Sequence, residues 1–369
     1  MNSKNLQTYF DCGFSKMRAG VFNKNNQTET YYTESEFFTN QLNLDLEIQK
    51  IITTLEKDTN EYINNINLMI DSPKMLSIGI SISKKLDGSK LSQANVQFLI
   101  QEAKQQIMRN YKYYNIIHII INDYKIDGIN YSYLPNDITC HFMSMDIFFI
   151  CLPNDLVTYF KNIFSKSNIL IKQIICSSYA KSINYKDNLT FTGYVSFIDI
   201  GFTKTSIISY LNDKILSLDV LPIGGNHITK DISKILSIGH EQSETIKINY
   251  DESKIFSDNS NFSSETIQKI IFARTQEILE LCAKSIKSNI FTNTQFRVIL
   301  TGEGSKIFGS QDTKKNQFFD DMDFLDESTE DICQSGFKLG KGINNQEVKI
   351  IPKKQTKQGF FEKLFHFFE

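Results

Sequence analysis

Residues 11–16 read D-C-G-F-S-K and residues 199–204 read D-I-G-F-T-K, so the pattern D-x-G-F-[S/T]-K occurs twice, 188 residues apart. Each copy stands between two runs rich in aromatic and β-branched residues, which is typical of the turn of a β-hairpin. A single D-x-G turn is common in unrelated proteins, but a second copy with the same flanking pattern indicates a duplicated unit. The sequence therefore predicts two related halves, each with one such hairpin.

The residue types in these turns suit a phosphate group and a metal ion. Glycine lets backbone N–H groups approach an anion closely, and hydroxyl and ammonium groups add further donors. Carboxylates beside phosphates are the ligands that Mg²⁺ prefers. We therefore predict that Asp11 and Asp199 bind Mg²⁺. The predicted phosphate-binding residues are Gly13, Phe14, Ser15, Lys16, Gly201, Phe202, Thr203 and Lys204.

Two further glycine-containing stretches extend this predicted site. Residues 298–304 read V-I-L-T-G-E-G, which predicts a buried strand and then a turn across which a flat base could lie. Residues 222–226 read P-I-G-G-N at the predicted start of a helix, whose first amides could meet anionic oxygens. The sequence contains neither G-x-G-x-x-G after an early strand nor G-x-x-x-x-G-K-[S/T], which excludes the usual dinucleotide and P-loop sites.

Composition excludes several other classes of protein. The chain has 369 residues, enough for more than one domain, with 40 Lys and Arg against 42 Asp and Glu and a net charge of −2. Such a balance provides no positive field for nucleic acid, which we do not expect as a partner. The six cysteines lack C-x-x-C spacing and indicate reduced thiols rather than a metal cage or disulfides. We expect no export signal and no membrane-spanning segment.

In this order the motifs resemble those of the actin-like ATPase superfamily and, within it, the FtsA family of bacterial cell-division proteins. The stretch 222–231 is similar to the family pattern P-x-[A/G]-G-x-x-[V/I]-T-x-D, and Ser243, Glu244 and Lys247 are similar to its A-E-x-x-K. The resemblance covers about residues 6–310 and resumes at the C-terminal tail. It implies ATP and Mg²⁺ as cofactors. It also implies further nucleotide-binding residues, namely Gly224, Gly225, Asn226, Glu244, Lys247, Gly302, Glu303 and Gly304.

The resemblance implies an α/β fold in which two ribonuclease H-like lobes form an actin-like ATPase, with an inserted α+β module and a C-terminal amphipathic helix. Its implied parts are subdomain 1A (1–74 and 152–192), subdomain 1C (75–151), subdomain 2A (193–225 and 294–350), subdomain 2B (226–293), a linker (351–358) and the terminal helix (359–369). Within 75–151 the pattern predicts a helix capped at Ser92, and it predicts a structural rather than a catalytic role for His118.

The last eleven residues, G-F-F-E-K-L-F-H-F-F-E, predict an amphipathic helix. At 100° per residue their apolar side chains occupy an arc of about 160°. A helix this short is marginal alone in water, so we expect it to order against a membrane interface or a protein groove, the protein's own core included. The predicted membrane-binding residues are Phe360, Phe361, Leu364, Phe365, Phe367 and Phe368.

The chain departs from the family pattern at positions that affect the mechanism. The second turn usually reads D-x-G-G-G-T, whereas Phe202, Thr203 and Lys204 follow the glycine here, and Glu303 stands where glycine is common. Residues 174–180 contain no Glu or Gln of the kind that orients water in related filament-forming ATPases. Since phosphoryl transfer needs a group that positions the attacking water, we expect nucleotide binding with slow or absent hydrolysis.

The resemblance implies a protein that binds ATP, polymerises and tethers FtsZ filaments to the cytoplasmic membrane at the division site. The implied partners are the C-terminal peptide of FtsZ at 226–293, further copies of the chain, the inner membrane at the terminal helix and later division proteins at 75–151. Three alternatives share the superfamily motifs: an actin-like scaffold of a pilus or secretion system, a small-molecule kinase, and a chaperone, for which the residues after Gly304 are few.

Overall fold

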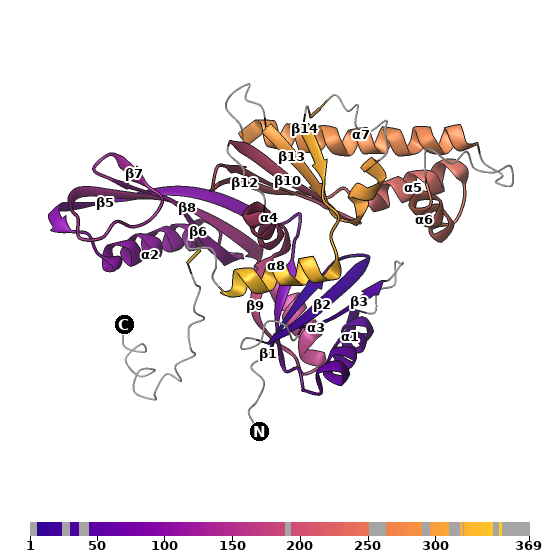
Figure 1. Cartoon of the computed structure of the whole chain (residues 1–369), viewed down its shortest axis with the longest axis horizontal. Helices are drawn as coiled ribbons and strands as arrows, with labels where there is room; N and C mark the ends of the chain where they lie inside the picture. The colour runs from indigo at the N-terminus through magenta and orange to yellow at the C-terminus, as the bar shows by residue number, and fades with distance from the viewer. Residues whose placement is uncertain are drawn as a thin grey trace.

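The computed structural model describes residues 6–23, 30–36, 44–188, 193–250, 263–289, 296–309, 318–319, 321–341 and 347–348. Within these ranges the chain forms three sheets with helices packed around them (Figure 1). The predicted linker 351–358 and terminal helix 359–369 lie outside the described residues. Among the helices in the described ranges, none combines the length and the apolar character needed to span a bilayer.

The first sheet has the strand order β3-β2-β1-β4-β9. Three strands, β1 (Leu6–Cys12), β2 (Lys16–Asn23) and β3 (Thr30–Glu36), are antiparallel, while β4 (Asn65–Ile70) and β9 (Leu170–Cys176) continue parallel to β1. Successive β1 side chains point to opposite faces. Tyr9 contacts Phe337 on one face, and Phe10 contacts Phe164 on the other. The sheet is therefore buried on both sides.

In the part of the chain that the structure describes, four helices cover this first sheet. Helices α1 (Leu44–Thr59) and α3 (Asn154–Lys166) pack together on one face, and α4 (Ser177–Asn188) packs with α8 (Thr329–Lys341) on the other. We call this sheet and its four helices the first lobe.

The second sheet repeats the first with the order β12-β11-β10-β13-β14. Strands β10 (Tyr194–Ile200), β11 (Thr205–Leu211) and β12 (Lys214–Leu221) are antiparallel, and β13 (Phe296–Thr301) and β14 (Asp321–Phe324) continue parallel to β10. The order and sense of the strands match the first sheet strand for strand. This match confirms the duplicated fold that the repeated turn predicts.

The helical segments described in this second half are α5 (Gly225–Leu236), α6 (His240–Ile248), α7 (Ser264–Asn289) and the 3₁₀ turn η1 (Glu303–Gly309). The long helix α7 follows the second sheet and extends beyond it toward α5 and α6 (Figure 1). Its C-terminal part packs on the sheet through Ile278 and Cys282, and its N-terminal part joins a small core with α5 through Ile267 and Ile271. We call this sheet and these helices the second lobe.

The inserted module, residues 76–153, is a third sheet with one helix. Its strands are β5 (Leu76–Lys90), β8 (Thr139–Pro153), β6 (Tyr114–Ile126) and β7 (Ile129–Tyr131), in that spatial order and all antiparallel. Helix α2 (Gln93–Asn110) starts after Ser92, as predicted, and buries its apolar stripe. His118 is fully buried: its Nδ1 lies 2.6 Å from Glu347 Oε1, and its Nε2 accepts the Cys176 N–H at 2.9 Å. These contacts fit the predicted structural role.

The position of α8 corrects the expectation that residues 294–350 belong to the second half. This helix packs against α4, β1 and β2 of the first lobe. The ring of Phe337 stacks on Phe22 with 4.3 Å between centroids, and Gly336 and Gly340 face the ring of Tyr9. The two glycines are four residues apart and provide the flat surface on which Tyr9 rests.

Candidate functional site

The two repeated turns lie on opposite sides of one cleft between the lobes. In the first, Gly13 N–H donates to Lys16 O at 3.1 Å, and in the second, Gly201 N–H donates to Lys204 O at 2.9 Å, so the two loops close in the same way. A cavity of about 80 Å³ lies between them. Both turns contribute to its walls, with Asp11, Gly13, Phe14, Ser15, Lys16, Asp199, Gly201, Phe202, Thr203 and Lys204. The structure thus brings together every residue that the repeated motif predicts.

A larger cavity of about 310 Å³ adjoins the first and shares Lys16, Phe202 and Glu303 with it. Of the other predicted residues, Gly225, Glu244, Lys247 and Gly304 line this second cavity, while Gly302 lines the first. Gly302 has φ +86°, a conformation that favours glycine, and its turn lies directly against the end of β10. The apolar contribution comes from Ile228, Ile248, Tyr250 and Ile307. This cavity has the size and the mixed lining of a small-molecule site.

Glu244 and Lys247 form one wall of the larger cavity. The ammonium of Lys247 lies 2.7 and 2.8 Å from the two carboxylate oxygens of Glu244 and 3.0 Å from Thr229 Oγ1, and Thr229 also donates to Glu244. Burial lowers the pKa of Lys247, and its contact with Glu244 only partly offsets that effect. The pair is buried and ordered, so it can present fixed polar atoms to a ligand.

The start of α5 supports the second turn and does not offer its amides to an anion as expected. Gly225 N–H donates to Gly201 O at 3.0 Å, and Asn226 N–H donates to Phe202 O at 2.7 Å. Gly224 N–H donates to His227 Nδ1 at 3.1 Å. Neither Gly224 nor Asn226 lines a cavity described above. These residues therefore hold the turn in place.

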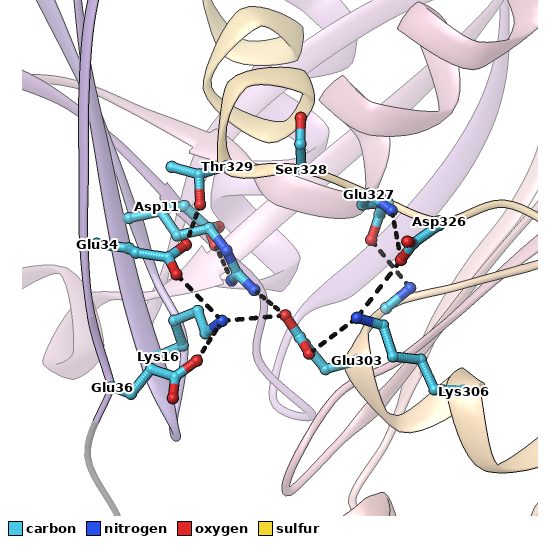
Figure 2. A network of polar contacts seen from close by, with 12 residues as sticks. Asp11, Lys16, Glu34, Glu36, Glu303, Lys306, Asp326, Glu327, Ser328 and Thr329 are labelled. Atoms are coloured by element: carbon cyan, nitrogen blue, oxygen red, sulfur yellow. Dashed lines mark hydrogen bonds and ion pairs between the residues drawn. The ribbon is translucent and has the colours of Figure 1, made fainter.

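Glu303 crosses the cleft from the second lobe and occupies the centre of the first turn's basic groups, as Figure 2 shows. Its carboxylate lies 3.2 Å from Lys16 Nζ and 3.0 Å from Arg18 Nη2. Lys16 also pairs with Glu34 at 3.4 Å and with Glu36. Burial raises the pKa of Glu303, but Lys16, Lys306 and Arg18 lower it more strongly. The carboxylate is therefore ionised and pairs the lobes electrostatically.

Lys181 of α4 reaches the other side of the cleft, where it contacts both Asp199 and Glu327. Its Nζ lies 2.6 Å from Asp199 Oδ2 and 3.0 Å from Glu327 Oε1. Glu327 also accepts Tyr185 O–H at 2.5 Å and Gly302 N–H at 2.9 Å. Burial lowers the pKa of Lys181, but the two carboxylates raise it well above its usual value, so the ammonium is charged.

Sequence reasoning missed Arg18, Lys181 and Glu327. Arg18 faces Asp11 across the first hairpin, and its Nη1 lies 3.5 Å from the carboxylate. Lys181 carries one available signal, since it is a charged residue in the small and apolar stretch C-S-S-Y-A-K directly after β9. Glu327 stands in a polar, acidic run and has no sequence signal, because only the fold brings it to Lys181.

The two aspartates predicted to bind Mg²⁺, Asp11 and Asp199, both line the smaller cavity and both have partners within the protein. Asp11 accepts Ser177 O–H at 2.8 Å and faces the guanidinium of Arg18, and Asp199 pairs with Lys181. In the part of the chain that the structure describes, no group of three or more His, Cys, Asp or Glu residues could hold a metal ion. The cations that these aspartates face, Arg18 and Lys181, each contact a second carboxylate as well, Glu303 and Glu327.

Asp71, which directly follows β4, connects the second turn to the first lobe through hydrogen bonds. Its backbone oxygen accepts from Lys204 Nζ, and its carboxylate accepts Ser206 O–H at 2.9 Å. Burial raises the pKa of Asp71, but Lys204, Ser206 and Cys176 lower it more strongly. Lys204, predicted to bind phosphate, is therefore engaged in a contact between the lobes.

Comparisons with known proteins identify similar chains. The family model described as Cell division protein FtsA matches residues 196–310. The chain is 25% identical over 275 residues to Cell division protein FtsA of Buchnera aphidicola subsp. Schizaphis graminum (strain Sg), which covers 69% of this chain and 62% of that protein. It is 25% identical over 353 residues to Cell division protein FtsA of Buchnera aphidicola subsp. Acyrthosiphon pisum (strain APS), which covers 83% and 82%. The alignment with the first of these spans about three fifths of the relative's length.

Solved structures add evidence on the fold. A chain of the PilM-PilN type IV pilus biogenesis complex superimposes with a TM-score of 0.64 at 12% identity, covering 95% of this chain and 93% of that chain. At this identity the likeness shows the fold alone. Together the comparisons confirm the resemblance to FtsA and the actin-like fold.

Proposed function

Because the chain is similar to FtsA and has an actin-like ATPase fold, we propose that it is an ATP-binding cell-division protein that polymerises and tethers FtsZ filaments to the cytoplasmic membrane. The nucleotide assignment rests on one observation. Two copies of D-x-G-F-[S/T]-K, each in the turn of an equivalent hairpin, line the smaller cavity. The larger cavity beside it has glycines in its wall.

The triphosphate would lie between the two turns and the adenosine in the larger cavity. Lys16 and Arg18 supply the positive charge, and the phosphates would replace the Glu303 carboxylate that now contacts both side chains. Glu244 and Lys247 stand on the wall of the larger cavity, where the resemblance assigns contacts with the ribose and base.

We expect slow or absent hydrolysis. The groups that follow β9 in the cleft are Ser177, which donates to Asp11, and Lys181, which is protonated and paired with Asp199. Neither can accept a proton from an attacking water in this state, and phosphoryl transfer depends on a group that orients that water.

The tethering role rests on the relatives and on the sequence of the tail. Residues 359–369 would attach the protein to the cytoplasmic side of the membrane at the septum, and the lobe 226–293 would receive the C-terminal peptide of FtsZ. The module 75–151 would contact later division proteins, and copies of the chain would assemble into filaments. Weak attachment by one short helix becomes firm when a polymer presents many copies.

Co-sedimentation with liposomes tests this function. We expect FtsZ polymers to pellet with liposomes when the full chain and ATP are present, and to remain in the supernatant with a chain that ends at Gln358. A chain in which Lys363 is replaced by Gln is the matched control, because it keeps the apolar face. FtsZ that stays in the supernatant with the full chain would contradict the tether and favour the alternative of a pilus or secretion scaffold.

A further inference from the structure

The last described residues of the chain, Glu347 and Val348, lie against strand β6 of the inserted module. The Val348 N–H donates to Ile119 O at 2.9 Å, and Glu347 forms an antiparallel bridge with Ile120. The side chain of Val348 packs against the core of the module, and that of Glu347, which is 14% exposed, lies 2.6 Å from His118 Nδ1. These two residues therefore make a backbone, an apolar and a polar contact with the module.

The side of β6 that these two residues contact is otherwise open. Strand β8 pairs along the opposite side of β6, and β7 pairs with β6 only at residues 124–126. Within the described ranges, residues 114–118 therefore have no strand on this second side. On the face that belongs to the module's core, Tyr114 and Ile116 are only partly buried. An open strand edge of this kind can pair with a further strand.

The sequence that continues from Val348 fits such a strand. Residues 347–352 read E-V-K-I-I-P, and β-branched residues favour strands. In an antiparallel pair, residues two apart point their N–H groups to the same side. The N–H of Ile350 would therefore follow that of Val348 toward β6. Pro352 is the next residue in this series, and it has no N–H to donate, so the pairing would end at Ile351.

We propose that residues 347–351 form a fifth strand of the inserted module, added antiparallel to the open side of β6. The side chain of Ile350 would lie on the same face as that of Val348 and cover Tyr114 and Ile116. This strand requires neither nucleotide nor membrane. In the proposed tether it would leave only residues 352–358 between the module and the membrane-binding helix, at most about 25 Å of extended chain.

Glu347 is the anchor of this strand, and through His118 it also reaches the first lobe. His118 Nε2 accepts the Cys176 N–H at 2.9 Å. Because that nitrogen is an acceptor, the proton of the neutral imidazole is on Nδ1 and is donated to Glu347. Glu347 is therefore a positioning residue that holds His118 in the tautomer that the Cys176 N–H needs.

Proline substitutions in the full-length chain test the strand, with hydrogen exchange in β6, followed by mass spectrometry, as the readout. Val348→Pro removes the N–H that donates to Ile119, and Ile350→Pro removes the next donor. We expect each to raise exchange at residues 115–119 by about tenfold or more. Lys354→Pro is the matched control, because it makes the same substitution beyond the segment and should exchange like the wild type.

Two results would overturn the added strand. Wild-type exchange in Val348→Pro would show that the segment does not hold β6. A rise in Val348→Pro without a rise in Ile350→Pro would show that the contact ends at Val348. Exchange in β10, which belongs to the sheet of the second lobe, verifies that each variant is folded.

Nitrogen-15 NMR of the His118 imidazole tests the anchor. We expect the Nδ1–H tautomer in the wild type and in Glu347→Gln, which keeps an oxygen acceptor, and the appearance of the other tautomer in Glu347→Leu, where Nδ1–H loses its acceptor. Glu280→Leu is the matched control, since Glu280 pairs with Lys284 on α7. A wild-type tautomer in Glu347→Leu would overturn the anchoring role of Glu347.

Discussion

At the scale of single residues, Glu303 occupies the position beside Lys16 and Arg18 that the phosphates of the proposed nucleotide would take. It stands where the resemblance to FtsA predicts glycine, and its carboxylate bridges Lys16 and Arg18. An internal carboxylate in this position has the charge and hydrogen-bonding capacity of a phosphate oxygen pair. A bound phosphate would therefore compete with the Glu303 carboxylate for Lys16 and Arg18. The net affinity for the nucleotide would be what remains after the contacts of Glu303 are lost.

We predict that Glu303→Gln raises the affinity for ATP by about tenfold, because the amide has the same shape but no negative charge to compete for Lys16 and Arg18. Calorimetric titration measures the change. Glu280→Gln is the control, since Glu280 pairs with Lys284 on the surface of α7. Unchanged or weaker binding in Glu303→Gln would show that this carboxylate does not compete with the ligand.

At the scale of elements, the sequence predicted what local pattern determines and missed what packing determines. The helix that begins after Ser92 follows from its cap and its apolar stripe, and the two hairpins follow from their shared turn. The place of α8 could not be predicted, because its docking depends on Tyr9, more than 300 residues earlier in the chain. Lys181 and Glu327 were missed for the same reason: their partners are near only in the folded protein.

The docking of α8 depends on the absence of a side chain at Gly340. A Cβ there would overlap the Tyr9 hydroxyl. We predict that Gly340→Ala lowers the free energy of unfolding by about 1–3 kcal/mol, although alanine favours a helix over glycine, because the overlap forces α8 away from the sheet. Urea denaturation measures it. Gly79→Ala, where nothing lies within 4 Å, should change stability far less. A Gly340→Ala protein as stable as the wild type would refute this account of the docking.

At the scale of the whole molecule, the inserted module touches both lobes and so limits how far the cleft can open. Its strand β6 reaches the first lobe through His118, which accepts the Cys176 N–H. The same strand reaches the second lobe through Asn122, whose amide exchanges two hydrogen bonds with the backbone of Ile215, at 2.8 and 3.1 Å. Lys214 of β12 also pairs with Asp123 at 2.5 Å. A change in the angle between the lobes must therefore strain or break contacts at β6.

We predict that Asn122→Ala loosens the second lobe from the module. The variant leaves the N–H and C=O of Ile215 without their side-chain partner, which should cost about 1–3 kcal/mol and raise hydrogen exchange in β12 near residues 214–216. Asn115→Ala is the matched control, because Asn115 lies on the same strand but bonds Asn154, which follows β8. Hydrogen-exchange mass spectrometry compares the three proteins with and without nucleotide. If exchange in β12 is the same in wild type and Asn122→Ala, this contact does not hold the lobe. If nucleotide raises hydrogen exchange in β12 of the wild type, the angle between the lobes changes on binding and the contacts between β6 and β12 break.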